Sequence, residues 1–136
     1  MTFDSRFEVE RIVGPSLAAR GFALDEVDPR VDEGGRWGSV VYYRGSDTKV
    51  QVYLSTREGE VNCMIAPLDA PNEYGLTNRS NKWRYFTWFV ERPNVPLEEL
   101  VNLIPVPPRT GEGRLELVKE TIEECFSAAH AGILQI

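Results

Sequence analysis

Three short runs of alternating residues between Gly38 and Pro67 constrain the fold of this chain more than any other feature. Successive side chains of a β-strand point to opposite faces of the sheet, so alternate residues share one face. The apolar residues that share a face in this way are Val41 and Tyr43, then Val50, Val52 and Leu54, then Val61, Cys63 and Ile65. The pattern predicts an antiparallel β-meander that turns this face toward the core.

Two turn sequences set the register of the predicted strands. Gly-Ser-Asp at residues 45–47 closes the first hairpin, and Arg-Glu-Gly at residues 57–59 closes the second, with Gly59 in the left-handed region. Counting outward from the second turn pairs Leu54 with Val61. The turns and the alternation therefore predict the same register.

Apolar residues at helical spacing precede the meander. Phe7, Val13 and Leu17 belong to this stripe, and Pro15 interrupts it, which predicts a kink or two shorter helices. Gly21, followed by Phe22, has the sequence of a left-handed helix cap. A short first strand from Phe22 to Val27 and an acidic loop over residues 28–35 are expected to follow.

A longer apolar stripe runs from Leu115 to Ile133 and predicts a long C-terminal helix, with a short helix at residues 97–104 before it. A helix with one apolar stripe must bury it, so we expect the N-terminal and C-terminal helices on the Val50/Val52/Leu54 face. The expected fold is α+β: an antiparallel β-meander sheet with both helices packed on one face, in a single domain over residues 1–136.

An aromatic run, Trp-Arg-Tyr-Phe-Thr-Trp-Phe-Val at residues 83–90, predicts a further strand that ends before Pro93. Both of its faces are apolar, so it crosses the middle of the domain or displays an aromatic patch. A polar connection at residues 68–82 precedes it, and loops of this length have a function or short structure of their own.

Composition and charge narrow the partners. The chain has 136 residues and a net charge of -6, which disfavours nucleic acid and anionic membranes because both attract basic surfaces. A protein partner is expected, with a basic one favoured by the acidic charge, and a homodimer is an alternative. The N-terminal residues 1–4 lead into an acidic segment with no signal-peptide or transmembrane pattern, so a cytoplasmic location is expected.

Residue types that carry catalysis are sparse. The chain has one histidine, His130, and two cysteines, Cys63 and Cys125, which lie at apolar positions typical of buried free thiols. A hydrolytic triad, a zinc site and a phosphate-binding glycine loop all lack their sequence patterns. We therefore expect no enzyme, no metal and no cofactor.

The outer face of the predicted meander is more apolar than a solvent-facing surface needs to be. Together with the aromatic strand it predicts a partner-binding or dimer surface at Tyr42, Tyr53, Met64, Trp83 and Tyr85. The alternative is that a helix or a second copy of the chain covers these residues.

A second hypothesis is a small-ligand pocket between the aromatic strand 83–90 and the loop 68–82. Cations and aromatics interleave there, at Arg79, Lys82 and Arg84 beside Trp83 and Tyr85, as an anionic or planar ligand requires.

The order of elements, with the Leu17, Gly21 and Phe22 helix stop and the acidic balance, resembles small acidic bacterial interaction proteins. These are the type III secretion chaperone-like group and the immunity proteins of polymorphic toxin systems. The resemblance implies a non-enzymatic protein-binding domain, immunity-like or chaperone-like, in which function resides in a surface.

Overall fold

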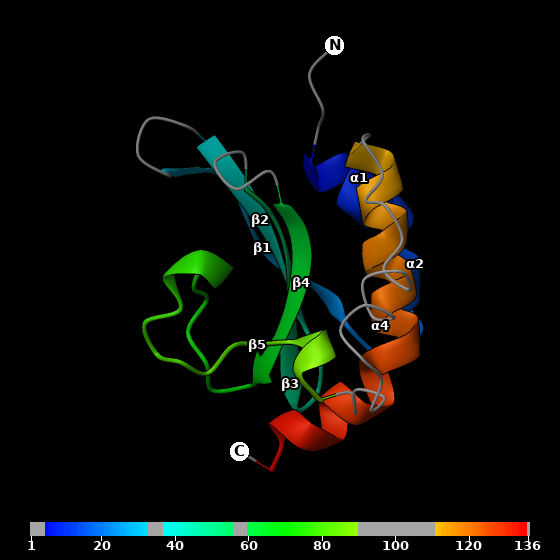
Figure 1. Ribbon diagram of the computed structural model, residues 1–136, viewed down its shortest axis with the longest axis vertical. Helices are drawn as coiled ribbons and strands as arrows, with labels where there is room; N and C mark the ends of the chain where they lie inside the picture. The colour runs from blue at the N-terminus through cyan, green and yellow to red at the C-terminus, as the bar shows by residue number, and fades with distance from the viewer. Residues whose placement is uncertain (1–4, 33–36, 56–59, 90–110, 136) are drawn as a thin grey trace, which may run out of the picture.

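The structure, a computed structural model, describes residues 5–32, 37–55, 60–89 and 111–135. One antiparallel sheet stands between a layer of helices and a long loop (Figure 1). The elements are α1 (Ser5–Ile12), α2 (Gly14–Ala18), β1 (Ala23–Asp32), β2 (Trp37–Arg44), β3 (Thr48–Ser55), β4 (Glu60–Pro67), the 3-10 helix η1 (Gly75–Thr77), β5 (Arg84–Tyr85), the 3-10 helix η2 (Phe86–Phe89) and α4 (Gly111–Ile133). The protein is therefore α+β, as predicted.

The meander has the predicted register. The strand order is β1-β2-β3-β4-β5, and each strand runs antiparallel to its neighbour. Leu54 pairs with Val61, and Val52 pairs with both Cys63 and Val41. The first turn is closed by a 2.9 Å hydrogen bond from the Gly45 N–H to the Thr48 carbonyl. The second turn and the expected helix at residues 97–104 lie outside the described residues.

All three described α-helices pack on one face of the sheet and enclose the main core (Figure 1). This core includes Val9, Ile12 and Leu17 from the first two helices and Val13 between them, Val41, Val50, Val52, Cys63 and Ile65 from the sheet, and Leu115, Val118, Ile122, Cys125, Ala129 and Ile133 from α4. The predicted inward face is therefore confirmed. Both cysteines are buried free thiols, and burial raises the pKa of each.

The N-terminal helical segment is divided at Pro15, which lies in the first turn of α2. Proline is tolerated there because the N–H it lacks has no partner within the helix. Gly21 has a φ of 84°, and the Phe22 N–H donates to the Leu17 carbonyl at 3.0 Å. The predicted left-handed helix stop is confirmed.

The predicted acidic loop at residues 28–35 is wrong over its described part, because β1 extends to Asp32. Pro29 fits within this strand since β1 is at the edge of the sheet, where a proline removes no inter-strand hydrogen bond from the middle of a ladder. The pairing with β2 shifts between Asp28 and Val31, as at a β-bulge.

The predicted aromatic strand is also wrong in length. Only Arg84 and Tyr85 pair with β4, and the chain then turns into η2. This turn lets Phe86 enter the main core, where it is fully buried. It also sets Phe89 so close to α4 that a Cβ added at Gly132 would lie 2.2 Å from the Phe89 ring. Tertiary packing against α4 thus overrides the strand propensity of the run.

Within the described ranges, no helix is both long and apolar enough to span a bilayer.

A candidate binding cleft beside a second core

The outer face of the sheet carries a second core, covered by the loop of residues 68–82. Tyr42, Tyr53, Met64 and Trp83 are each at most 3% exposed, and Tyr85 is half-buried against them. The prediction that these residues form an open contact surface is therefore wrong for the first four. The cover is the protein's own loop, which lies on the other side of the sheet from the α-helices (Figure 1).

Side-chain hydrogen bonds from β3 and from Trp83, just before β5, hold this loop against the sheet. The Lys49 ammonium donates to the Ala70 carbonyl at 2.9 Å, and the Gln51 amide donates to the Glu73 carbonyl at 2.8 Å. The Trp83 indole N–H donates to the Pro71 carbonyl at 3.0 Å. A loop that covers a core must have its backbone groups satisfied, and these three bonds do so for three carbonyls.

The loop is also closed on itself. The Lys82 ammonium lies 3.0 Å from the Asp69 carboxylate and joins the two ends. The Glu73 carboxylate accepts hydrogen bonds from the Ser80 hydroxyl, from the Ser80 N–H and from the Arg79 N–H. These bonds, that of the Ser80 hydroxyl foremost, hold the pKa of Glu73 below its usual value. The loop is thus a folded unit with its own internal contacts.

Gly75 is where the loop backbone approaches the sheet most tightly. A Cβ at this position would lie 2.7 Å from both the Met64 sulfur and a Tyr53 ring carbon. We expect Gly75→Ala to lower the free energy of unfolding by about 1–3 kcal/mol, the usual cost of overpacking. Chemical denaturation measures this change in the free energy of unfolding.

Gly14→Ala is the matched control, because the nearest atom to its added Cβ is 3.8 Å away and the position lies in a helix. We expect it to be neutral or slightly stabilising. Equal destabilisation by the two substitutions would contradict the close approach at Gly75.

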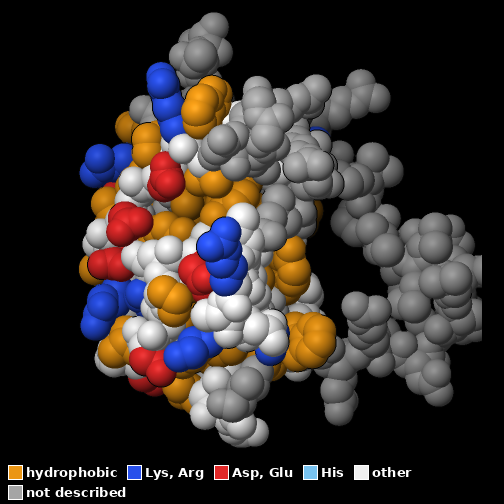
Figure 2. Space-filling model, turned by 90° about the vertical axis from the view of Figure 1, so that its left-hand side faces the viewer, with side chains coloured by type: hydrophobic (Ala, Val, Ile, Leu, Met, Phe, Trp, Pro, Cys, Tyr) orange, Lys and Arg blue, Asp and Glu red, His pale blue; other side chains and the backbone are white. Residues whose placement is uncertain are grey.

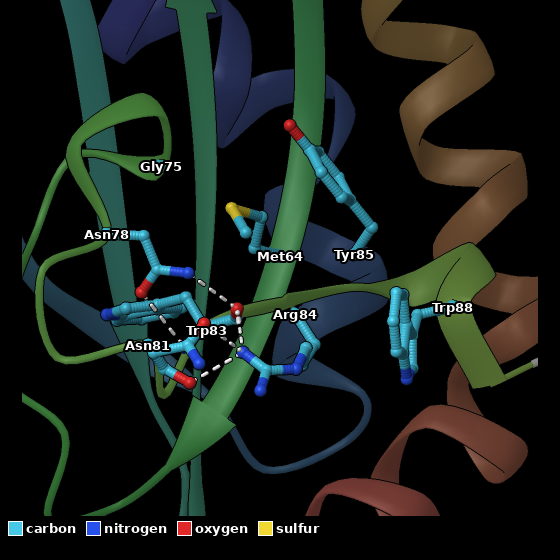
Figure 3. A pocket seen from close by; sticks show the side chains of 8 residues that line it. All are labelled: Met64, Gly75, Asn78, Asn81, Trp83, Arg84, Tyr85 and Trp88. Atoms are coloured by element: carbon cyan, nitrogen blue, oxygen red, sulfur yellow. Dashed lines mark hydrogen bonds between the residues drawn. The ribbon is translucent and has the colours of Figure 1, made fainter.

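A cavity of about 380 Å³ opens where the loop meets β5 and η2. Its lining is Met64, Gly75, Asn78, Asn81, Trp83, Arg84, Tyr85 and Trp88 (Figure 3). Trp83 is anchored to the loop by the Asn78 side chain, which donates to the Trp83 carbonyl at 2.9 Å. The Tyr85 hydroxyl lies 2.9 Å from the Tyr53 hydroxyl. The cavity occupies the place predicted for a small-ligand pocket.

Arg84 lies between Asn81 and Trp88 at this cavity (Figure 3). Its Nη1 donates to the Asn81 carbonyl at 2.5 Å, to the Asn81 side-chain oxygen at 3.0 Å and to the Trp83 carbonyl at 3.1 Å. Its guanidinium carbon lies 5.9 Å from the centroid of the Trp88 ring, which is within cation–π range. Asn81 has a φ of 59°, a left-handed conformation that asparagine tolerates.

Charge distinguishes this cavity from the rest of the molecule. Among the described residues that line it, Arg84 alone carries a formal charge, whereas the whole chain has a net charge of -6. Across the loop-covered face, basic and acidic side chains are interspersed with apolar ones (Figure 2). The cavity therefore offers one positive group beside an aromatic ring, within a surface of mixed charge.

The structure does not bring all the predicted cations together. Arg79 is exposed on the loop and Lys82 pairs with Asp69, so neither lines the cavity. Sequence reasoning missed Asn78, Asn81 and Gly75 as lining residues. The available signal was the clustering of turn-forming residues in the loop, because such residues adopt the conformations that close approaches require.

A second, smaller cavity of about 210 Å³ lies near the first hairpin turn. The Phe126 ring stacks on His130 with centroids 5.4 Å apart, and the Arg20 guanidinium carbon lies 5.4 Å from the centroid of Phe126. The His130 Nε2 lies 2.9 Å and 3.0 Å from the two carboxylate oxygens of Asp47. These contacts tie the turn to the end of α4.

The pair of Asp47 and His130 should make the free energy of unfolding depend on pH in the acidic range. The hydrogen bond from His130 lowers the pKa of Asp47 below its usual 3.8. A carboxyl with a lowered folded pKa contributes stability that is present above its unfolded pKa and lost as pH falls through the folded pKa. We expect the free energy of unfolding to fall below about pH 5, and to fall less in Asp47→Asn. The effect is modest because the pair is partly exposed.

Urea unfolding at a series of pH values between about 2 and 6 measures this effect. Glu116→Gln, which removes an exposed acid from α4, is the control. If Asp47→Asn lost stability as steeply as the parent over that range, the assigned role of the pair would be wrong.

Among the described residues, no group of three or more His, Cys, Asp or Glu side chains is placed to hold a metal ion. The arrangement at the larger cavity suits recognition, since it combines a fixed cation, aromatic surface and two amide side chains. Comparison of the chain with protein-family models, with curated proteins and with solved structures gives no match in any of the three.

Proposed function

We propose that this protein is a non-enzymatic binding domain that holds a small ligand in the cavity between the loop of residues 68–82 and the segment of residues 83–89. The single observation that carries the proposal is the position of Arg84. Its guanidinium is held by three acceptors through one nitrogen and lies over an exposed tryptophan at a cavity of about 380 Å³.

Size and lining support a small ligand. Pockets for small molecules run from roughly 300 to 1,000 Å³ and combine apolar walls with a few placed polar groups. Met64, Trp83, Tyr85 and Trp88 supply apolar wall here, and Asn78, Asn81 and Arg84 supply the polar groups. Most of these groups are held by hydrogen bonds within the protein, so little ordering is needed when a ligand binds.

A protein partner is the second candidate, immunity-like or chaperone-like in its action. Trp88 is 68% exposed and lies beside Arg84, and tryptophan and arginine are the residue types that dominate interface energies. A partner chain would then dock over the mouth of the same cavity. The buried residues Tyr42, Tyr53, Met64 and Trp83 would support that site from below without touching the partner.

A fragment screen followed by two-dimensional amide NMR tests the proposal. We expect binding fragments to shift the amide signals of residues 75–85 and the indole N–H signals of Trp83 and Trp88. Trp88→Ala should weaken those fragments, while the neighbouring exposed substitution Thr87→Ala should leave their affinity unchanged. A screen in which no compound shifts these signals, or in which all shifts lie elsewhere, would refute a ligand site here.

A further inference from the structure

Building on the proposed ligand site, we infer that the cavity recognises a single carboxylate group, held by Arg84, on a planar apolar body that lies against Trp88. Such a ligand is an aromatic or similarly planar monocarboxylate.

The pattern of hydrogen bonds that Arg84 makes indicates that the ligand carries a carboxylate. In the described part of the chain, all three of its bonds start from Nη1. The Nε and Nη2 groups therefore retain their N–H donors along the other edge of the planar guanidinium. Two parallel N–H donors on one edge match the two oxygens of a carboxylate, and such bidentate pairs are among the stronger hydrogen bonds in proteins.

The charge of the site argues for one negative charge on the ligand. Arg84 is the one charged residue among the described residues that line the cavity, and neither Lys82, whose ammonium is paired with Asp69, nor Arg79 is part of that lining. The net charge of -6 would repel a dianion such as a phosphate monoester, and the described lining holds no second cation to offset that repulsion. One fixed guanidinium balances one carboxylate.

The walls suit a planar body. The exposed ring of Trp88 stands at one side of Arg84, and Met64 and Tyr85 line the same cavity (Figure 3). Aromatic rings stack on indole, and a thioether makes favourable contacts with ring edges. The cavity volume of about 380 Å³ is near the lower end of the range for small-molecule sites, so the ligand is compact.

Matched pairs of acids and amides test the inference by NMR titration. The probes are benzoate, phenylacetate, 3-phenylpropionate, indole-3-acetate and 2-naphthoate, each beside its carboxamide, with phenyl phosphate as the dianion. We expect at least one acid to shift the cavity signals and to bind about tenfold or more tightly than its amide, because hydrogen bonds to charged groups are the stronger ones. Phenyl phosphate should bind more weakly than that acid.

Two variants of Arg84 assign the preference to this residue. Arg84→Met should abolish the difference between acid and amide, and Arg84→Lys should restore part of it, because lysine keeps the charge without the planar fork. Unchanged amide signals outside residues 75–89 show that each variant is folded. An acid preference that survives Arg84→Met, or tighter binding of phenyl phosphate, would overturn the inference.

The remaining outcomes separate this inference from the proposed function. If fragments of other classes bind the cavity and every acid fails, the carboxylate inference falls and the ligand site stands. If nothing shifts the cavity signals, both fall. Acetyl-Gly-Phe with a free carboxylate, compared with its C-terminal amide, distinguishes a small acid from the end of a protein chain. Tighter binding of this peptide than of the small acids assigns the site to the C-terminus of a protein partner. It also supports recognition of the carboxylate through Arg84.

Discussion

Replacing Trp83 by alanine is expected to lower the free energy of unfolding by about 3–5 kcal/mol, as for other large aromatic truncations in cores. Trp83 is fully buried, and its ring centroid lies 6.1 Å from that of Tyr42. The substitution also removes the indole N–H donor to the Pro71 carbonyl, which leaves a loop carbonyl without that partner. The second core and the attachment of the loop are both weakened.

Urea unfolding measures this loss, with Trp88→Ala as the matched control. Trp88 is 68% exposed, so its truncation should change the free energy of unfolding by no more than about 0.5 kcal/mol. The loss of unfolding free energy in Trp83→Phe should lie between those of the two alanine variants, because phenylalanine keeps most of the buried ring and lacks the N–H. If the two alanine variants were equally stable, the burial of Trp83 beneath the loop would be wrong.

The two tryptophans also distinguish an effect on stability from an effect on binding. Trp83→Ala should lower both the stability of the protein and its affinity for ligand, since Trp83 lines the cavity and belongs to the second core. Trp88→Ala should keep its stability and lose affinity for the aromatic acids described above. A binding loss in Trp88→Ala can therefore be assigned to the contact with the ligand.

Val52→Asp is expected to cost about 3 kcal/mol or more, because it places an uncompensated carboxylate in an apolar core. Val52 is fully buried and lies in the central strand β3, where it pairs with Val41 and Cys63. Its face is the one covered by all three described α-helices. No shift of an edge strand could bring this side chain to water.

Thermal unfolding at pH 7 and at pH 4 checks this expectation, since a buried aspartate is less costly when protonated. Ser127→Asp adds the same charge at an exposed position of α4 and should change stability little. A Val52→Asp protein that melted within a degree or two of the parent would contradict the assignment of the inward face.

Much of the fold could be predicted from the chain because its signals are local. The pairing of Leu54 with Val61 follows from a short turn and a period of two, and the division at Pro15 follows from a missing N–H. The left-handed cap at Gly21 is likewise a property of a few adjacent residues. Each of these features depends on groups a few positions apart, and the structure confirms all of them.

The aromatic segment shows where local signals stop being sufficient. Its composition predicts a strand, yet Phe86 and Phe89 leave the sheet to pack on the helix side, and Gly132 on α4 provides the space for the Phe89 ring. The sequence predicted an open contact surface on the outer sheet face, but most of the residues named for it are buried. Tyr42, Tyr53 and Met64 are buried beneath the loop. The sequence did not predict this cover because the loop is not a regular element with a periodic pattern.

The sequence by itself therefore determined the α+β class, the register of the meander and the face on which α1, α2 and α4 pack, because periodicity and turn residues act over short separations. Only the tertiary structure decided that the outer face of the sheet is covered as well. Lys49 and Gln51 alternate with the inward residues Val50 and Val52 and therefore point to the outer face. Each is nevertheless buried, as a donor to a carbonyl of the covering loop 21 and 22 residues further along the chain. These long-range bonds hold the loop over the outer face, and Arg84 and Trp88 lie at the edge of the core it covers. The sequence does not reveal such bonds, because a backbone carbonyl can accept a donor whatever side chain its residue carries.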